Sequence, residues 1–188
     1  MIEDTKTATD KDNLTKTVAI IKQEYRKQEE KYLREKKYLR QTLGGYFAGS
    51  AIDDMFRLFK LMKLSQYNKF VDLGSGDGRV VFVASLFTKA RGVEIDPELH
   101  AIAEKMKHRL SIPAEFVEQD FLKEDISDTD IIFMNPDARM YDIEKKLHQE
   151  MKKHAMLIVY NAVFKPLNLK LVKEIKLKGS KALIYQKD

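Results

Sequence analysis

The stretch FVDLGSGDGRVV, residues 70–81, decides the fold, because it joins two apolar runs through three closely spaced glycines. The first run predicts a buried β-strand over 69–73, and the second predicts a helix that begins at Arg79. Glycines between a strand and a helix permit a tight turn and let backbone N–H groups approach a ligand. The stretch therefore predicts the first strand and the ligand-binding loop of an α/β sheet.

Strands and helices alternate through the rest of the chain. We expect strands over 90–95, 114–118, 130–134, 155–160, 170–177 and 182–186, helices over 79–88, 97–110 and 141–153, and a short helical segment over 121–126. Apolar runs such as IIFM (131–134) are typical of strands buried on both faces. The pattern predicts an α/β fold with a doubly wound, mostly parallel, seven-stranded Rossmann-like sheet. It ends in an antiparallel C-terminal strand, paired through the turn KGSK at 178–181.

A long charged helix is predicted before the sheet. Residues 1–12 are polar and are expected to form a disordered tail, whereas residues 13–43 contain neither Gly nor Pro and predict one helix that stops at Gly44-Gly45. Apolar residues recur at sevenfold spacing from Val18 to Leu39, but their partner positions are mostly polar. A helix lying on its own domain, or a weak dimer contact, is therefore favoured over a coiled coil. A second helix is expected over 50–64, with Ser50 as its cap.

Composition excludes several kinds of site. The 188 residues contain no cysteine, and the four histidines lack metal-ligand spacing, so we expect no metal site. No apolar run approaches the ~18 residues of a membrane span, and the polar N-terminus does not resemble a signal peptide, so we expect a cytoplasmic protein. The net charge of +5 fits either an acidic or nucleic-acid partner or a solvated Lys-rich surface.

The glycine-rich stretch carries the first candidate ligand-binding residues. Dinucleotides, nucleoside phosphates and S-adenosylmethionine are all bound by loops of this kind. The dinucleotide pattern GxGxxG needs a third glycine at the position of Arg79, and the acidic side chains of Asp72 and Asp77 suit the cationic sulfonium and ammonium of S-adenosylmethionine better than a pyrophosphate. The cofactor-binding candidates here are Asp72, Gly74, Ser75, Gly76, Asp77 and Gly78.

The ends of the next two strands add further cofactor-binding candidates. Glu94 lies twenty residues beyond Gly74, the spacing at which a carboxylate binds ribose hydroxyls, and Ile95 follows it. After the third strand, Asp120 is suited to accept a hydrogen bond from an adenine amino group, and Phe121 to pack beside the ring. Alternatively, Asp120 is a helix cap and Phe121 a core residue.

These motifs resemble those of class I S-adenosylmethionine-dependent methyltransferases over about residues 46–188, which implies a methyltransferase domain there and S-adenosylmethionine as cofactor. The charged helix, taken as 13–45, precedes this domain. VDLGSGDGRVV, ARGVEIDPEL, FLKEDISDTDIIFMNPD and LIVYNAVFKP are similar to the small protein-lysine methyltransferases of archaea and their mitochondrial relatives. In that group a segment before the first sheet helix closes over the cofactor. GGYFAGSA, at 44–51, occupies that position, although Ala48-Gly49-Ser50 stands where the family often has Pro-Thr or Pro-Ser.

Asn135-Pro136-Asp137 follows the fourth strand and points to the methyl acceptor. It is similar to the NPP-aromatic motif of enzymes that methylate planar amino groups, but Asp137 replaces the second proline and Ala138 replaces the stacking aromatic. A carboxylate suits a cationic amine such as lysine, so Asn135 and Asp137 are the catalytic candidates, although Asn-Pro-Asp is also a common turn. Asn135 is a cofactor-binding candidate as well. Candidate walls of a lysine channel are Tyr46, Phe47, Tyr160, Asn161 and Phe164.

Three functions remain open on the sequence. A protein-lysine N-methyltransferase with a protein substrate is favoured. An RNA or DNA amino-methyltransferase is an alternative, in which the helix at 22–40, with eight Lys/Arg and four Glu, binds phosphates. A second alternative is a non-catalytic protein that binds S-adenosylmethionine and recruits a partner through this helix.

Overall fold

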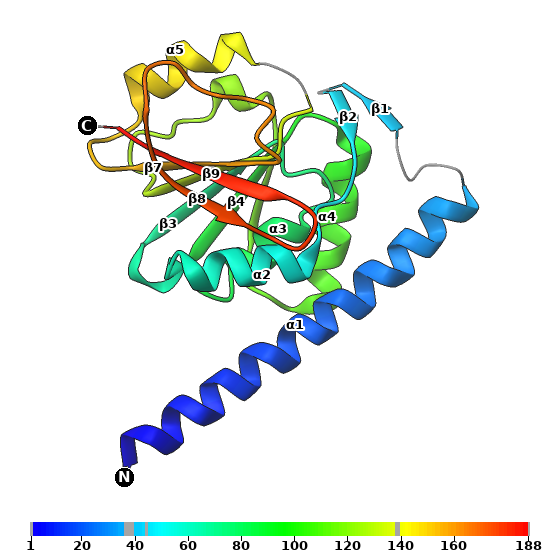
Figure 1. The fold of residues 1–188 in the computed structure, drawn as a ribbon. Helices are drawn as coiled ribbons and strands as arrows, with labels where there is room; N and C mark the ends of the chain where they lie inside the picture. The colour runs from blue at the N-terminus through cyan, green and yellow to red at the C-terminus, as the bar shows by residue number, and fades with distance from the viewer. Residues whose placement is uncertain (1, 36–39, 44, 138–139, 188) are drawn as a thin grey trace.

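A seven-stranded sheet with helices on both faces forms the body of the chain, and a long helix precedes it (Figure 1). The computed structural model describes residues 2–35, 40–43, 45–137 and 140–187. The strands are β1 (Arg40–Thr42), β2 (Gly45–Phe47), β3 (Lys69–Leu73), β4 (Lys89–Glu94), β5 (Glu115–Glu118), β6 (Ile131–Met134), β7 (Met156–Tyr160), β8 (Lys170–Lys176) and β9 (Lys181–Gln186). The α-helices are α1 (Ile2–Arg34), α2 (Ile52–Leu61), α3 (Arg79–Ala84), α4 (Pro97–Leu110) and α5 (Tyr141–Glu150), and short 3₁₀ helices span Leu64–Gln66 and Phe121–Lys123.

The sheet order is β5-β4-β3-β6-β7-β9-β8. Strands β3 to β7 pair in parallel, whereas β9 pairs antiparallel with both β7 and β8. These pairings confirm the predicted fold class, including the antiparallel C-terminal pair. The order reverses between β3 and β6, and in such sheets ligands bind at this switch point, beyond the carboxyl ends of the strands.

The central strands are buried on both faces, as their apolar runs predict. Ile131 and Phe133 of β6 join the cluster under α1, α2 and α3, whereas the alternate residues Ile132 and Met134 join the cluster under α5. This alternation follows from the twofold period of a strand. Because apolar side chains cover both faces of these strands, polar functional groups are placed beyond the ends of the strands.

The N-terminal helix differs from the prediction at both ends. α1 spans Ile2–Arg34, so it includes residues 2–12, which we expected to be disordered, and it stops well before Gly44. Arg40–Thr42 and Gly45–Phe47 instead form a small antiparallel hairpin, β1–β2, because their backbones pair with each other. The predicted contact position Leu39 lies outside the described residues.

The prediction that this helix lies on its own domain is confirmed for its second half. Val18, Ile21 and Tyr25 are buried in the cluster under α1, and Tyr32 is buried against Phe47 of β2, with ring centroids 6.0 Å apart. In Figure 1 the N-terminal turns of α1 extend away from the sheet domain. None of the helices in the described part of the chain is long and apolar enough to cross a membrane.

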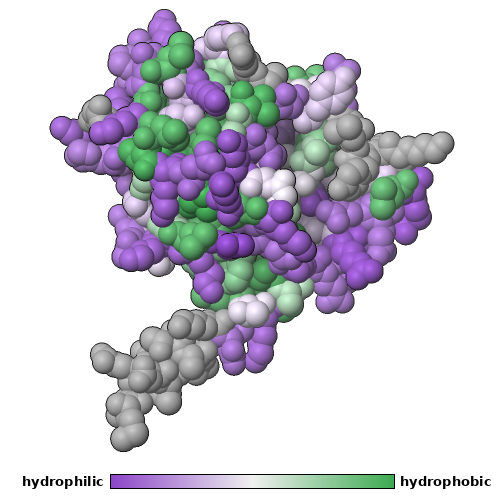
Figure 2. Space-filling model, viewed as in Figure 1, coloured by the Kyte–Doolittle hydropathy of each residue, from purple (hydrophilic) through white to green (hydrophobic). Residues whose placement is uncertain are grey.

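The surface is polar with small apolar patches, and Figure 2 shows such green patches scattered among hydrophilic side chains on one face.

Before α2, the predicted Ser50 cap is wrong, because Ala51 occupies the N-cap position and makes no side-chain cap hydrogen bond. The Ser50 side chain is directed elsewhere, as described below.

The aromatic cluster beneath α2 gives a test of this fold. Phe59 is fully buried, with ring centroids 5.3 Å from Phe70 and 6.3 Å from Phe133. Phe59→Ala leaves a cavity, and we expect it to lower the free energy of unfolding by about 3–5 kcal/mol in urea denaturation. Leu61→Ala on the same helix, at a side chain 49% exposed, is the control and should change it by less than about 0.5 kcal/mol. Equal losses would contradict the packing described.

Candidate active site

A cavity with two adjoining lobes lies beyond the carboxyl ends of β3, β4, β6 and β7. The larger lobe has a volume of about 250 Å³ and the smaller about 80 Å³, and we call them together the site cavity. Residues shared by both lobes are Tyr46, Phe47, Gly74, Gly76, Asn135, Pro136 and Asp137. A larger hollow of about 650 Å³ lies at the opposite ends of the strands, beside Lys69 and Lys89. The topology favours the site cavity over that hollow, because α/β sheets bind ligands at carboxyl ends.

Each glycine of the loop at 74–78, the glycine loop, has its own reason to lack a side chain. Gly74, Gly76 and Gly78 have φ values of 83°, 56° and 84°, in the left-handed region that favours glycine. A Cβ on Gly74 would meet no atom within 4 Å, so this backbone faces open space in the site cavity. A Cβ on Gly76 would lie 2.7 Å from the Phe47 ring, and one on Gly78 2.7 Å from the Phe116 ring. In a GxGxxG loop the third glycine, at the position of Arg79 here, permits close packing of the helix. In this chain Gly78, one residue earlier, permits that packing.

Two buried carboxylates flank the loop. Asp72, at 2% exposure, lines the larger lobe, and burial, followed by the charges of Glu94 and Asp77, raises its pKa well above the ordinary range. Glu94 lines the smaller lobe and accepts hydrogen bonds from the Gly76 amide at 2.7 Å and the Asp96 amide at 2.8 Å. Burial raises the pKa of Glu94 in spite of these hydrogen bonds. A cationic ligand beside Asp72 would relieve the repulsion between these carboxylates.

Asp77 does not make the loop acidic in the way the sequence suggests. Its carboxylate accepts hydrogen bonds from Arg79 at both oxygens, at 3.0 Å to Nε and 2.7 Å to Nη2. Burial would lower the pKa of Arg79, but the bond to Asp77 outweighs it and raises that pKa further above its ordinary value. The charge of Asp77 is therefore compensated within the loop, and Asp72 is the carboxylate left to face a ligand cation.

Of the remaining cofactor-binding candidates, Ile95, Phe121 and Ser75 line the site cavity and Asp120 does not. Ile95 and Phe121 line the smaller lobe. Ser75 lines the larger lobe, and its buried hydroxyl has no hydrogen-bond partner among the described residues. Asp120 is not among the residues that line either lobe, and its carboxylate caps the 3₁₀ helix by accepting from the Leu122 amide at 2.9 Å. The helix-cap alternative describes this geometry, and Phe121 alone of the pair reaches the cavity.

Asn135 stands at the centre of a short hydrogen-bonded chain across the cavity. Its side-chain amide nitrogen donates to Ser50 Oγ at 3.1 Å, and its oxygen accepts from the Asn161 amide nitrogen at 2.9 Å. Asn161 follows β7 with φ of 63°, a left-handed conformation that Asn tolerates better than most residues. Three segments distant in sequence thus meet at one amide. The sequence missed Ser50 as a partner of Asn135 because no local pattern marks a contact across 85 residues.

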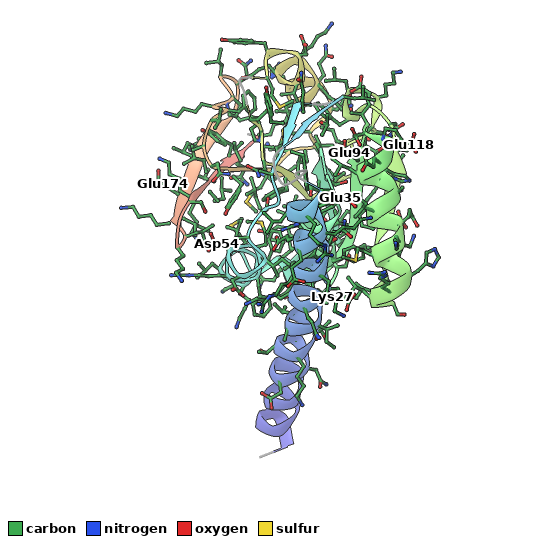
Figure 3. The ribbon with its side chains drawn as sticks, turned by 90° about the vertical axis from the view of Figure 1, so that its right-hand side faces the viewer. Lys27, Glu35, Asp54, Glu94, Glu118 and Glu174 are labelled. Carbon is green, nitrogen blue, oxygen red and sulfur yellow. The ribbon has the colours of Figure 1, made fainter. Side chains whose placement is uncertain are left out.

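Asp137 fastens the β1–β2 hairpin over the cavity. Its exposed carboxylate accepts a hydrogen bond from the Tyr46 backbone amide at 2.7 Å. A Cβ on Gly45 would lie 2.7 Å from the same carboxylate, so glycine permits this close approach. Glu94 lies near the hairpin in Figure 3, whereas Asp54 lies on α2, away from it. The hairpin therefore covers the smaller lobe and brings Tyr46 and Phe47 to the cavity.

Two predicted channel residues lie away from the cavity. The Tyr160 hydroxyl donates to Asp54 at 3.2 Å and accepts from Ser180 at 2.8 Å, and Tyr160 belongs to the apolar cluster under α2. Phe164 is buried in the opposite cluster, under α5. Neither side chain lines a lobe, so the structure does not bring these two residues to the cavity, whereas Asn161 and Val163 do line the larger lobe. In the part of the chain that the structure describes, no group of His, Asp or Glu is arranged to hold a metal ion.

Comparison with known proteins agrees with this geometry. The family described as the ANTKMT methyltransferase domain matches residues 72–168, which include the glycine loop, Glu94, Asn135 and Asn161. A protein-lysine N-methyltransferase from Saccharolobus islandicus is 33% identical over 102 residues, which are 51% of this chain and 63% of that protein. The chain thus matches less than two thirds of the length of this curated relative.

Solved structures show the same fold at low sequence identity. An RNA methyltransferase from Salinibacter ruber, in complex with S-adenosyl-L-homocysteine, superposes with a TM-score of 0.63 at 20% identity, over 74% of this chain and 93% of that one. A methyltransferase from Geobacter sulfurreducens superposes with a TM-score of 0.58 at 20% identity, over 71% and 78%. At this identity the likeness concerns the fold alone.

The contact between Asp137 and Tyr46 gives a test of hairpin closure. Asp137→Ala removes the acceptor, and because a hydrogen bond to a charged group contributes about 1.5 kcal/mol, the Tyr46 amide should exchange its hydrogen about tenfold faster. Hydrogen exchange followed by NMR measures this rate. Asp142→Ala, at an exposed residue in the first turn of α5, is the control. An unchanged Tyr46 rate in Asp137→Ala would show that other contacts close the hairpin.

Proposed function

The chain belongs to the family of ANTKMT methyltransferase domains, and from that premise we propose that it methylates protein lysine side chains with S-adenosylmethionine as the donor. One observation carries the proposal most directly. The buried carboxylate of Asp72 faces the larger lobe beside the bare backbone of Gly74, which is an arrangement suited to a cationic ligand with amino-acid character.

The residues of the site cavity fit S-adenosylmethionine in three places. Asp72 would attract its sulfonium and ammonium charges, with the open Gly74 backbone beside them. Glu94 would accept hydrogen bonds from ribose hydroxyls through lone pairs that its backbone contacts leave free. Ile95 and Phe121 would pack against the adenine ring in the smaller lobe. Asp77 would contribute through its backbone, because its carboxylate is occupied by Arg79.

The bound donor supplies an electrophilic methyl group on sulfur. The chain's own residues would hold the acceptor nitrogen in line with it, and the lysine ammonium must first lose a proton to solvent water to expose the nitrogen lone pair. Lysine has an ordinary pKa of ~10.4, and the partly enclosed larger lobe favours the neutral form by desolvation. Asn135 and Asn161 would orient the amine, since the Asn135 oxygen can accept a second hydrogen bond.

We propose different roles for the two catalytic candidates. Asn135 lines both lobes and is held from both sides, so it remains the candidate that contacts the acceptor. Asp137 supports the site through the hairpin, because one of its carboxylate oxygens accepts the hydrogen bond from the Tyr46 amide. In this proposal, methyl transfer depends on positioning and desolvation of the lysine amine and uses no dedicated general base.

A nucleic-acid arm finds less support in the structure. Several cations in the second half of α1 are paired with acids, as in Lys22–Asp53, Lys27–Glu24 and Lys31–Glu35. Such pairs lower the positive potential that phosphate binding needs. We therefore keep RNA methylation as an outcome of the functional test.

The test is a transfer assay with isotope-labelled S-adenosylmethionine on separated total protein and total RNA. We expect labelled methyl-lysine in protein by mass spectrometry, and Asn135→Ala should slow turnover about 100-fold, because misplacing the acceptor costs about that factor. Asp142→Ala, at an exposed residue outside the site cavity, is the matched control and should turn over normally. Label found in RNA alone would overturn the lysine proposal, and binding without any transfer would favour the non-catalytic alternative.

The raised pKa of Asp72 predicts that cofactor affinity depends on pH. Burial, then Glu94 and Asp77, raises the pKa of Asp72. A proton on this carboxylate competes with the cationic cofactor, so affinity is greatest above the raised pKa and falls as the pH drops through it, by at most about tenfold per pH unit for one proton. Calorimetry between about pH 5.5 and about pH 8, a range above the ordinary Asp pKa of ~3.9, measures this dependence.

Asp72→Asn separates this effect from other titrations. The variant should bind more weakly at neutral pH and lose most of the dependence, whereas the residual slope would come from Glu94, whose pKa is also raised by burial. Wild-type affinity that stays constant over the same range would contradict an ion pair between Asp72 and the cofactor.

A further inference from the structure

A single buried guanidinium connects the glycine loop to the N-terminal helix. Arg79 is 4% exposed and binds Asp77 through two nitrogens, while its third, Nη1, donates to Glu29 of α1 at 2.6 Å. The guanidinium carbon also lies 4.8 Å from the centroid of the Tyr25 ring. All three nitrogens of the guanidinium are thus engaged, and α1 supplies one of the acceptors and the aromatic face.

A second contact from α1 reaches the loop backbone directly. The Tyr25 hydroxyl, fully buried, donates to the Asp77 carbonyl oxygen at 2.6 Å. α1 therefore holds the carbonyl of Asp77 directly, through Tyr25, and its carboxylate indirectly, through the bond of Glu29 to Arg79. On the other side, Glu94 accepts from the Gly76 amide at 2.7 Å. The loop between Gly76 and Gly78 is clamped between these two sets of contacts.

This clamp matters because the loop has little stiffness of its own. Its glycines add no side-chain packing that would favour one backbone conformation, and glycine has wide backbone freedom. The geometry in which Gly74 faces the site cavity must then come from neighbouring contacts. The same guanidinium also touches the segment before α2, where a Cβ on Gly49 would lie 2.3 Å from it. Ser50, next in the chain, is the partner of Asn135.

We propose that Glu29 and Tyr25 of α1 are positioning residues that hold the glycine loop in its cofactor-binding conformation. α1 then belongs to the binding machinery for the cofactor, although neither side chain reaches the smaller or the larger lobe. The identity of the ligand rests on the proposed function, but the dependence of the loop on α1 does not.

The first test measures cofactor affinity in a variant that keeps the fold. Glu29→Gln preserves the size of the side chain and removes its charge, and we expect S-adenosylmethionine to bind about tenfold more weakly in calorimetry, within the range of typical couplings between sites. Turnover at saturating cofactor should stay unchanged, so that the effect falls on KM and not on kcat. Tyr25→Phe, which removes only the hydroxyl, should act in the same direction.

Glu30→Gln is the matched control. Glu30 is adjacent on the same helix, exposed, and paired only loosely with Arg26 at 3.6 Å, so its loss should leave affinity unchanged. A thermal melt of each variant without cofactor records any general loss of stability, and affinities are compared well below the melting transition.

The second test uses the reciprocity of coupled sites. If α1 supports the loop, cofactor binding must support α1, so hydrogen exchange in residues 18–34 should slow on adding S-adenosylmethionine to the wild type, and slow less in Glu29→Gln. A merely structural contact would shift the melting temperature and leave this response intact. Wild-type affinity in both Glu29→Gln and Tyr25→Phe would overturn the inference. Absence of cofactor binding in the wild type would instead overturn the proposed function.

Discussion

The ion pair between Asp77 and Arg79 is the constraint on which the site depends. Two hydrogen bonds hold the carboxylate against the guanidinium, and both groups are almost fully buried. Buried charges are costly unless they are paired, so loss of either partner would leave an uncompensated charge under the glycine loop. The pair also decides which carboxylate is available to a ligand. Because the charge of Asp77 is compensated by Arg79, Asp72 is the buried carboxylate beside the glycine loop that is available to a ligand in the larger lobe.

Much of the sheet was predictable, because its signals are local. Apolar runs bounded by glycine and charged residues predicted the seven strands, and α4 begins and ends at the predicted residues, with Asp96 as its side-chain cap. The glycine loop, Glu94 and Asn135 were also predictable, since the topology of an α/β sheet brings the residues after β3, β4 and β6 to one edge. Strand order and the position of the cavity follow from the same rule.

The errors arose where tertiary contacts decide the outcome. Tyr160 is the last residue of β7, as in the strand predicted over 155–160, but it lies in phase with Ile158 and joins the cluster under α2. A continuous apolar run does not show which face of the sheet each of its residues takes. The pairing of Arg40–Thr42 with Gly45–Phe47 replaced the end of the predicted helix, and the bond from Tyr46 to Asp137 that holds this hairpin joins residues too far apart in sequence for a local pattern to mark. Likewise, the tie from Arg79 to Glu29 spans fifty residues, and no local pattern marks it.

That separation has a consequence for how the chain is made. α1 is synthesised before the loop and sheet on which it packs, and domains fold as their parts become available. Until β3 and α3 have formed, the apolar stripe of Val18, Ile21, Tyr25 and Tyr32 has no surface to cover it. Until then this stripe stays exposed on the nascent helix. The contacts of Tyr25 and Glu29 with the glycine loop therefore form together with the burial of this stripe.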